Sequence, residues 1–274
     1  MIALLRAELR KCWSRRSVHL FGLLALAGII LAGVLVFINS AHPTQVCEAT
    51  KAGVPQCRPH NVFNLVDLKQ VVRGASISLL ILGIALAASF IGAEWGAGTM
   101  TTLLTWEPRR GRVYAAKLLA AAIFAFISAI IVLIVLSLAL LPSALAHGST
   151  AGADSSWVLA TTYSVLRGAL ICGVSAGIGL AIGSLARNTT AAVIGAFFYL
   201  FVLENLVRGL KPHWIGWLFG DNATEFVIGH RVVVDTSQGP ILSHGPVAAL
   251  LAVCAYAAIL TAAAVALFFK RDVT

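Results

Sequence analysis

Six stretches of this chain run for about the length of a membrane span with almost no charged side chain. A helix needs about 20 mostly apolar residues to cross roughly 30 Å of hydrocarbon, so these stretches leave few folds open. They predict an all-α polytopic membrane protein with a single transmembrane domain over residues 1–274. Pro142 is expected to end the third of the six spans. The predicted spans lie at about residues 19–39, 74–93, 114–141, 161–186, 189–207 and 246–269.

The composition excludes a soluble enzyme. Of the 274 residues, 59% are hydrophobic and only 11% are charged, and the mean hydropathy is +0.91. Soluble domains carry roughly 25% charged residues, because a globular surface must be coated with polar groups. Disordered chains are polar and rich in charge, so the same numbers exclude them as well.

The distribution of charge predicts the orientation. If both termini are cytosolic, the inner segments hold twelve Lys and Arg against four acids, whereas the outer segments hold seven of each. Cytoplasmic loops carry the basic excess in membrane proteins. We therefore expect a multi-pass protein of a bacterial cytoplasmic membrane with both ends in the cytosol. Its basic residues would anchor on anionic membrane lipid, so no nucleic acid partner is needed to explain the net charge of +9.

The N-terminus precedes the first span with a pattern of its own. Apolar residues recur on one helical face, opposite Arg6 and Arg10, which predicts an amphipathic helix lying at the membrane surface. The alternative is a plain basic tail. The apolar run that follows is too long for a cleavable signal sequence. The residues of the apolar face are Ile2, Leu5, Leu9 and Trp13.

Two outer loops are expected, over residues 40–73 and 208–245. The first contains Cys47 and Cys57 on the oxidising side of the membrane, which favours a disulfide over two free thiols. The second follows the short fifth span and is rich in aromatic residues. It predicts either a broken, re-entrant helix or a belt of aromatic side chains at the membrane interface, with neither favoured.

The inner segment 94–112 is longer than a simple turn requires. It predicts a short apolar helix capped by Thr99 and stopped by Pro108. Leu103, Leu104 and Trp106 are too apolar to be left alone in the cytosol, so they require a partner or the membrane surface. A basic elbow follows and adds docking charge on the same side, at Arg109, Arg110 and Arg112.

At these residues the chain resembles the permeases of type-2 ABC transporters. That family has an acid at the inner end of the second span, then Gly-Thr, paired aliphatics, a Pro–Arg elbow and a Lys opening the third span. Here Arg109-Arg110 stands where the family often has a small or hydroxyl residue before its Arg. The matching residues are Glu94, Gly98, Thr99, Leu103, Leu104, Pro108, Arg110 or Arg112, and Lys117.

The resemblance implies a transporter subunit whose inner helix is seated on a cytosolic ATPase. The chain contains no G-x-x-x-x-G-K-[ST] loop, so we expect ATP and Mg to bind a separate subunit and no enzyme activity or cofactor in this chain. A second copy of the chain, or a similar permease, would complete the transporter. The expected cargo is hydrophobic or amphipathic and is exported.

Several residues receive candidate roles within this interpretation. Glu94 would be a buried pivot, paired with a basic residue of the neighbouring elbow; the alternative is an interfacial carboxylate without a role. The resemblance places the fifth span along the substrate path, although packing or contact with lipid would explain its aromatic residues equally well. Arg167 either pairs with Glu204 or extends to the interface. The path candidates are Phe197, Phe198, Tyr199, Glu204 and Arg167.

Two other classes of function stay open. An intramembrane enzyme would need catalytic groups converging at one depth, but the buried charges are few and the histidines lack ligand spacing, so no metal site is expected. A membrane sensor or immunity protein that transports nothing is the second, because a permease fold does not by itself determine function.

Overall fold

The computed structural model describes residues 2–49, 55–236 and 239–270, and it contains six helices long and apolar enough to cross a membrane. The predicted class, an all-α polytopic membrane protein with six spans, is confirmed. Several of the helices extend beyond the predicted spans, because their polar ends continue past the apolar centres. The spanning helices are α2 (Arg16–Ala41), α3 (Leu68–Gly96, preceded by the turn Leu65–Asp67), α5 (Arg110–Ala146), α6 (Ser155–Ala186), α7–α8 (Thr189–Leu210) and α10 (Pro246–Lys270).

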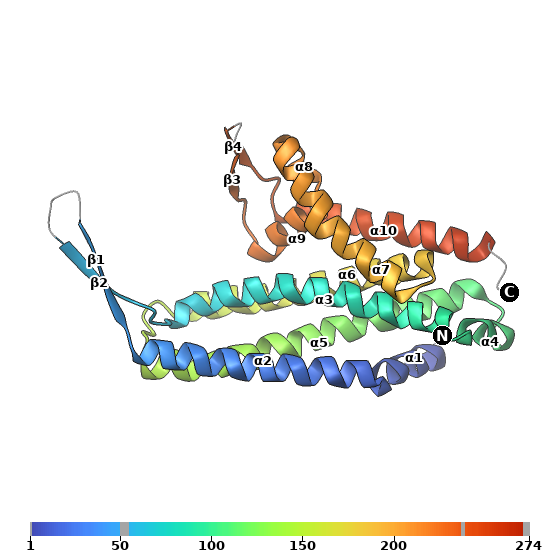
Figure 1. The fold of residues 1–274 in the computed structure, drawn as a ribbon, viewed down its shortest axis with the longest axis horizontal. Coiled ribbons are helices and arrows are strands. Elements are labelled where there is room, and N and C mark those ends of the chain that lie inside the picture. The colour runs from blue at the N-terminus through green and yellow to red at the C-terminus, as the bar shows by residue number, and fades with distance from the viewer. Residues whose placement is uncertain (1, 50–54, 237–238, 271–274) are drawn as a thin grey trace.

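Shorter elements lie at the two ends of the bundle. Helices α1 (Ile2–Ser14) and α4 (Thr99–Trp106) lie together with the C-terminal end of α10, which we call the inner end (Figure 1). Two antiparallel hairpins form in the predicted outer loops, away from that end. They consist of β1 (Thr44–Ala49) with β2 (Pro55–His60), and β3 (Val233–Thr236) with β4 (Gly239–Leu242).

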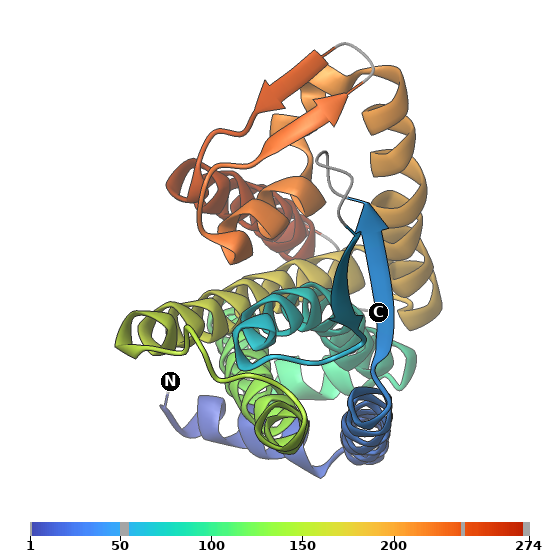
Figure 2. The same ribbon diagram turned by 90° about the vertical axis from the view of Figure 1, so that its left-hand side faces the viewer.

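Helix α6 is the centre of the fold. It lies between the α3–α5 pair and α10 (Figure 2) and makes its most extensive contact with α3. Small residues permit this close approach: a Cβ on Gly179 would collide with the backbone of Ile84, and one on Gly183 with that of Ala88. Because lipid is as apolar as a leucine side chain, close packing of small residues is what joins spanning helices.

Helix α2 packs closely on the bundle in its outer half. Its outer half contacts α5, where a Cβ on Gly33 would lie 2.9 Å from the carbonyl oxygen of Ala139. Nearby, the hydroxyl of Ser143 donates to Ser40 over 3.0 Å. This contact explains why the expected stop at Pro142 is wrong. Packing of the last turn against α2 keeps α5 helical through Pro142 to Ala146.

The fifth span is longer than predicted. A continuous helix of 22 residues runs from Thr189 to Leu210, with a π-helical stretch over Phe198–Leu203. The chain then breaks at Pro212–Trp217, and α9 (Phe219–Ile228) packs on α10 and α6. Each of the two alternatives for this region describes a part of it: Trp214 and Trp217 are exposed like an aromatic belt, while Phe219 and Phe226 of α9 return into the core.

Candidate functional site

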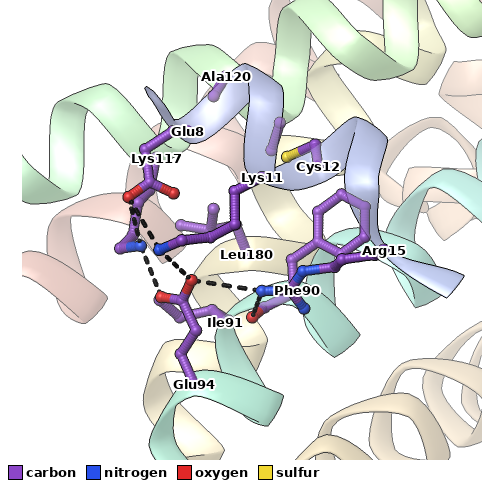
Figure 3. Close-up of a pocket in the computed structure, with 11 residues that line it drawn as sticks. Glu8, Lys11, Cys12, Arg15, Phe90, Ile91, Glu94, Lys117, Ala120 and Leu180 are labelled. Atoms are coloured by element: carbon purple, nitrogen blue, oxygen red, sulfur yellow. Dashed lines mark hydrogen bonds and ion pairs between the residues drawn. The ribbon is translucent and has the colours of Figure 1, made fainter. Parts of the chain in front are cut away.

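Five charged side chains form a cluster at the inner end of the bundle (Figure 3). Glu94 comes from the last turns of α3 and Lys117 from the start of α5, the two helices that α4 connects. Glu8 and Lys11 come from α1, one turn apart, and Arg15 follows at the junction of α1 with α2. The inner charge cluster therefore joins α1, α3 and α5.

Lys117 is the centre of the cluster. Its Nζ donates to Glu94 Oε2 over 2.5 Å and to Glu8 Oε1 over 2.9 Å. Lys11 Nζ approaches the same two carboxylates, at 3.1 Å from Glu94 Oε1 and 3.5 Å from Glu8 Oε1. Two carboxylates thus share the two ammonium groups. Charge-assisted hydrogen bonds of this kind are about twice as strong as neutral ones.

Arg15 extends the cluster to the start of α2. Its Nη2 donates to Glu94 Oε1 over 3.3 Å and to the carbonyl oxygen of Phe90 over 3.1 Å. The guanidinium carbon also lies 4.9 Å from the centre of the Phe90 ring, within the range of a cation–π contact. Arg15 therefore fixes the start of α2 to the inner part of α3.

Three of these charged side chains are buried, so they depend on one another for pairing. Glu8, Glu94 and Lys117 are only 4–7% exposed, so none of them could carry its charge without a partner. The space among them measures about 20 Å³, enough for about one water molecule. The cluster holds three cations and two carboxylates, so it carries a net charge of +1.

The electrostatic field of the cluster acts on the neighbouring groups of α1. Burial alone would lower the pKa of Lys11, but the carboxylates of Glu94 and Glu8 outweigh this effect, and the pKa of Lys11 is raised. Burial raises the pKa of the Cys12 thiol to about 11. Cys12 therefore stays protonated at neutral pH and acts as a small packing group.

Helix α4 is tied to the cluster at its first residue. Gly98 adopts a left-handed backbone conformation, φ 66°, which turns the chain from α3 into α4. The hydroxyl of Thr99 donates to the carbonyl oxygen of Glu94 over 3.3 Å. The prediction that Thr99 caps α4 is therefore wrong, because Thr99 is the first residue of the helix and its side chain turns back to α3. Pro108 does follow the end of α4, as expected.

The predicted docking residues separate into two groups. Met100 is fully buried and Leu103 is half-buried, so these side chains hold α4 on the bundle. Trp106 is 85% exposed, and Pro108, Arg109 and Arg112 are exposed beside it. The side chain of Leu104 lies outside the described residues.

Arg110 has a structural role at the elbow. Its Nη1 donates to the carbonyl oxygens of Phe268 (3.0 Å) and Phe269 (3.3 Å) at the C-terminal end of α10. A cation at this place satisfies orphan carbonyls and complements the helix dipole. Arg109 and Arg112, rather than Arg110, are thus the elbow arginines that a partner could contact.

The path candidates do not form one site. Tyr199 lines an apolar cavity of about 280 Å³ between α3, α6, α7 and α10, together with Tyr256. Phe197 and Phe198 lie partly exposed on the outside of the bundle. Glu204 is buried, and it accepts a hydrogen bond from the backbone N–H of Gly220 at 3.0 Å.

The suggested pair between Arg167 and Glu204 does not form. Glu204 is bonded to the start of α9, whereas the guanidinium of Arg167 lies against Gly229, just beyond the end of α9. Arg73 reaches the same end and donates to the carbonyl oxygen of Ile228 over 2.7 Å. The two arginines thus complement the C-terminal dipole of α9, an arrangement that sequence spacing could not show.

Sequence reasoning singled out Glu94, but the expected partner in the elbow is wrong: Glu94 pairs with Lys117, Lys11 and Arg15. The sequence reading also missed Glu8 as a member of the cluster. One signal was available: Glu8 is the only acid in a strongly basic N-terminal segment, and Lys11 follows it at helical spacing. The partner across the bundle could not be found in this way, because Lys117 lies 109 residues from Glu8.

The position of the cysteines in the first hairpin is set by its backbone register. Cys47 lies directly opposite Cys57 in the β1–β2 pair. Directly opposed residues in an antiparallel pair have Cα atoms about 4.5–5.5 Å apart, within the range that a disulfide spans. The side chains of both residues lie outside the described part, so the disulfide stays a prediction.

Comparison with known proteins agrees with this architecture. A family model described as "ABC-2 family transporter protein" matches residues 4–203, which include most of α1, the charge cluster and α4. The chain is also 28% identical over 149 residues to the uncharacterized membrane protein YdbK of Bacillus subtilis (strain 168), an overlap of 54% of this chain and 59% of that protein. The chain thus spans somewhat over half the length of this curated relative. Because the family model covers most of the chain, we conclude that the protein belongs to the ABC-2 family of membrane transporter proteins.

Proposed function

We propose that this chain is the membrane-embedded permease subunit of an ATP-driven exporter, and that a separate cytosolic ABC ATPase docks on segment 94–112. The observation that carries the proposal is the exposure of Trp106 on a helix whose other face is packed on the bundle. An exposed indole beside two arginines has the composition of an interface anchor, because Trp and Arg dominate the energetically important positions of protein contacts.

The connections of α4 support a mechanical role. The helix joins α3 to α5 directly, and the Glu94–Lys117 ion pair links these same helices; the hydroxyl of Thr99, at the start of α4, donates to the backbone of Glu94. Arg110 adds a link to α10, and the α1 side chains of the charge cluster add a link to α2. A displacement of α4 would therefore act on several spans together, as rigid-body transitions between packed elements require.

The transport path is proposed to involve the fifth span. Tyr199 and the 280 Å³ apolar cavity beside it suit a hydrophobic or amphipathic substrate. Phe197 and Phe198 lie partly exposed on the lateral surface of the same helix, where a second copy of the chain or a similar permease would pack. Arg167 is the least suited of the path candidates, because its guanidinium lies against Gly229 at the end of α9.

The location and the division of labour complete the proposal. We place the protein in a bacterial cytoplasmic membrane with both termini cytosolic, since the basic excess lies in the inner segments and α1, α4 and the end of α10 share one end of the bundle. We assign hydrolysis of ATP, with its Mg, to the partner subunit. This chain would contribute binding surfaces and motion and no catalytic residue.

Affinity purification from native membranes in mild detergent tests the docking surface. A stoichiometric ATPase should accompany the wild-type chain, and Trp106→Ala should remove most of it. Truncation of a central aromatic anchor typically costs at least about 2 kcal/mol, which is a loss of about thirtyfold in affinity. Trp217→Ala is the matched control, because Trp217 is also highly exposed but lies in the outer region.

The outcomes are separable. Equal recovery of an ATPase with both tryptophan variants would remove segment 94–112 as the docking surface but leave the transporter intact. Recovery of the wild-type chain without any nucleotide-binding partner would refute the proposed function itself. Glu94→Gln, which preserves the shape of the side chain, should retain the ATPase but lose stimulation of its turnover by the permease.

A further inference from the structure

The inner half of α2 stands apart from the helices beside it. Gly22 and Gly28 have no neighbouring atom within 4 Å of the position of a Cβ, whereas Gly33 in the outer half is tightly packed. The separation leaves two adjoining apolar cavities of about 400 and 650 Å³ along this part of α2, and Gly22 and Phe124 line both. We call this space the α2 wedge.

A polar hollow lies at the inner mouth of the wedge. It measures about 470 Å³ and is lined by Lys11, Arg15, Arg16 and Glu94, among others. The hollow and the wedge are adjacent along α2, because Ser17 lines the hollow and the next residue, Val18, lines the wedge. On the facing helix, Phe90 of the wedge lies one turn from Glu94.

Charge and hydropathy together define what could fill this space. The hollow presents three cations and one carboxylate, and the wedge below it is almost entirely apolar. A volume of several hundred Å³ is typical of ligand sites, roughly 300–1,000 Å³. The matching molecule has an anionic head and an apolar tail. Arg15 Nη2 donates both to Glu94 Oε1 and to the carbonyl oxygen of Phe90, and Arg15 also lines the hollow.

We propose that the α2 wedge binds one anionic phospholipid of the inner leaflet, with its phosphate in the hollow at Arg15 and Arg16 and an acyl chain against Gly22 and Phe124. A helix from a second copy fits less well, because its inner end would bring the same basic residues against this basic mouth. The proposal does not depend on the ATPase partner. It would, however, connect lipid to the transport machinery, since a phosphate on Arg15 competes with Glu94.

Retention of lipid by the purified full-length chain tests the proposal. The protein is exchanged into nanodiscs of equal parts dioleoyl phosphatidylglycerol and dioleoyl phosphatidylcholine, released into the gas phase, and weighed by native mass spectrometry. One phosphatidylglycerol should remain bound in preference to phosphatidylcholine. Each basic residue near an anionic headgroup contributes about a fivefold preference, so Arg16→Gln should lower the selectivity by about that factor.

Two matched controls make the result specific. Arg10→Gln removes another exposed cation from α1 that does not line the hollow, and it should leave the selectivity unchanged. Gly22→Leu should block the wedge and abolish retention, whereas Gly28→Leu adds the same side chain on the same helix outside the two cavities and should have no effect.

Three results would overturn the proposal. Equal retention of the two lipids would show that the wedge holds ordinary lipid only. An equal loss with Arg10→Gln and Arg16→Gln would show diffuse surface attraction rather than a site. A change of oligomeric state with Gly22→Leu, without a change in lipid retention, would assign the wedge to a second copy of the chain.

Discussion

Helices α6 and α2 are both membrane spans, but they stand at opposite extremes of packing. In the most apolar stretch of α6, 72% of the residues are buried, against 6% in α2. The mean hydropathy runs the other way, 2.0 for α6 and 2.8 for α2. Inside a membrane, apolar character therefore does not predict burial, because lipid solvates an apolar side chain as well as the protein core does.

Different forces attach the two helices to the fold. Helix α6 is held along its length by close backbone contacts at small residues, whereas α1 and α2 form an arm held at two points. One point is the inner charge cluster, and the other is the outer contact of Gly33 and Ser40 with α5. The arm should thus be sensitive to charge, and the centre to side-chain volume.

The largest effect is expected from Glu94→Ala, which should release the arm. It would leave three cations with one carboxylate, and Lys117 is only 4% exposed. Removing one partner of a buried ion pair typically costs about 3–5 kcal/mol. Denaturation in mild detergent should show this loss. Lys117→Met should cost less, because it leaves two cations with two carboxylates. The reverse order of the two variants would contradict the described charge balance.

A smaller effect is expected from Gly179→Leu in α6, which should push α6 from α3. A Cβ at this position already collides with the backbone of Ile84, and overpacking costs about 1–3 kcal/mol, sometimes more. The same substitution at Gly22 in α2 meets open space and should leave the unfolding midpoint within error of the wild type. Equal destabilisation by the two substitutions would refute the contrast between α6 and α2.

The reactivity of Cys12 should report the state of the arm. Burial raises the pKa of its thiol from 9.0 to about 11, so near pH 8 its alkylation should be slower by on the order of a hundredfold than that of an ordinary thiol. The unfolded thiol ionises first as pH rises, so the contribution of Cys12 to stability is complete below about pH 9 and is lost towards pH 11. Timed maleimide labelling followed by peptide mass analysis measures the alkylation rate of Cys12. The exposed Ser14→Cys variant, made in a Cys12→Ala background, provides the rate of an unprotected thiol, and equal rates would show that Cys12 is accessible.

The smallest effect on the bundle is expected at the first hairpin. Mass analysis of non-reduced protein should show Cys47 linked to Cys57, as their opposed register suggests. Reduction should leave the unfolding of the bundle nearly unchanged, because β1 and β2 lie beyond the end of α2 rather than between the spans (Figure 1). Free thiols at both positions in freshly isolated protein would exclude the disulfide.

The sequence was sufficient wherever a rule is local. Runs of apolar residues predicted six spans, and the order of an acid, a Gly-Thr pair and a Pro–Arg elbow indicated the family. Local rules failed where packing competes with them: Pro142 does not stop α5 because α2 supports its last turn, and Thr99 bonds back to Glu94 instead of capping α4.

Contacts between distant residues mark the limit of the sequence. By itself it determined that the chain lies in a membrane and belongs to a transporter family, since both follow from composition and from a short ordered motif. Only the tertiary structure showed that Glu94 forms ion pairs with Lys117 and Lys11 and that Arg110 donates hydrogen bonds to the end of α10. It alone also showed that the inner half of α2 stands apart from its neighbours and leaves the wedge open. The reason is that hydropathy determines whether a helix lies in the membrane, whereas the close packing of small residues and the pairing of buried charges determine which helices it contacts.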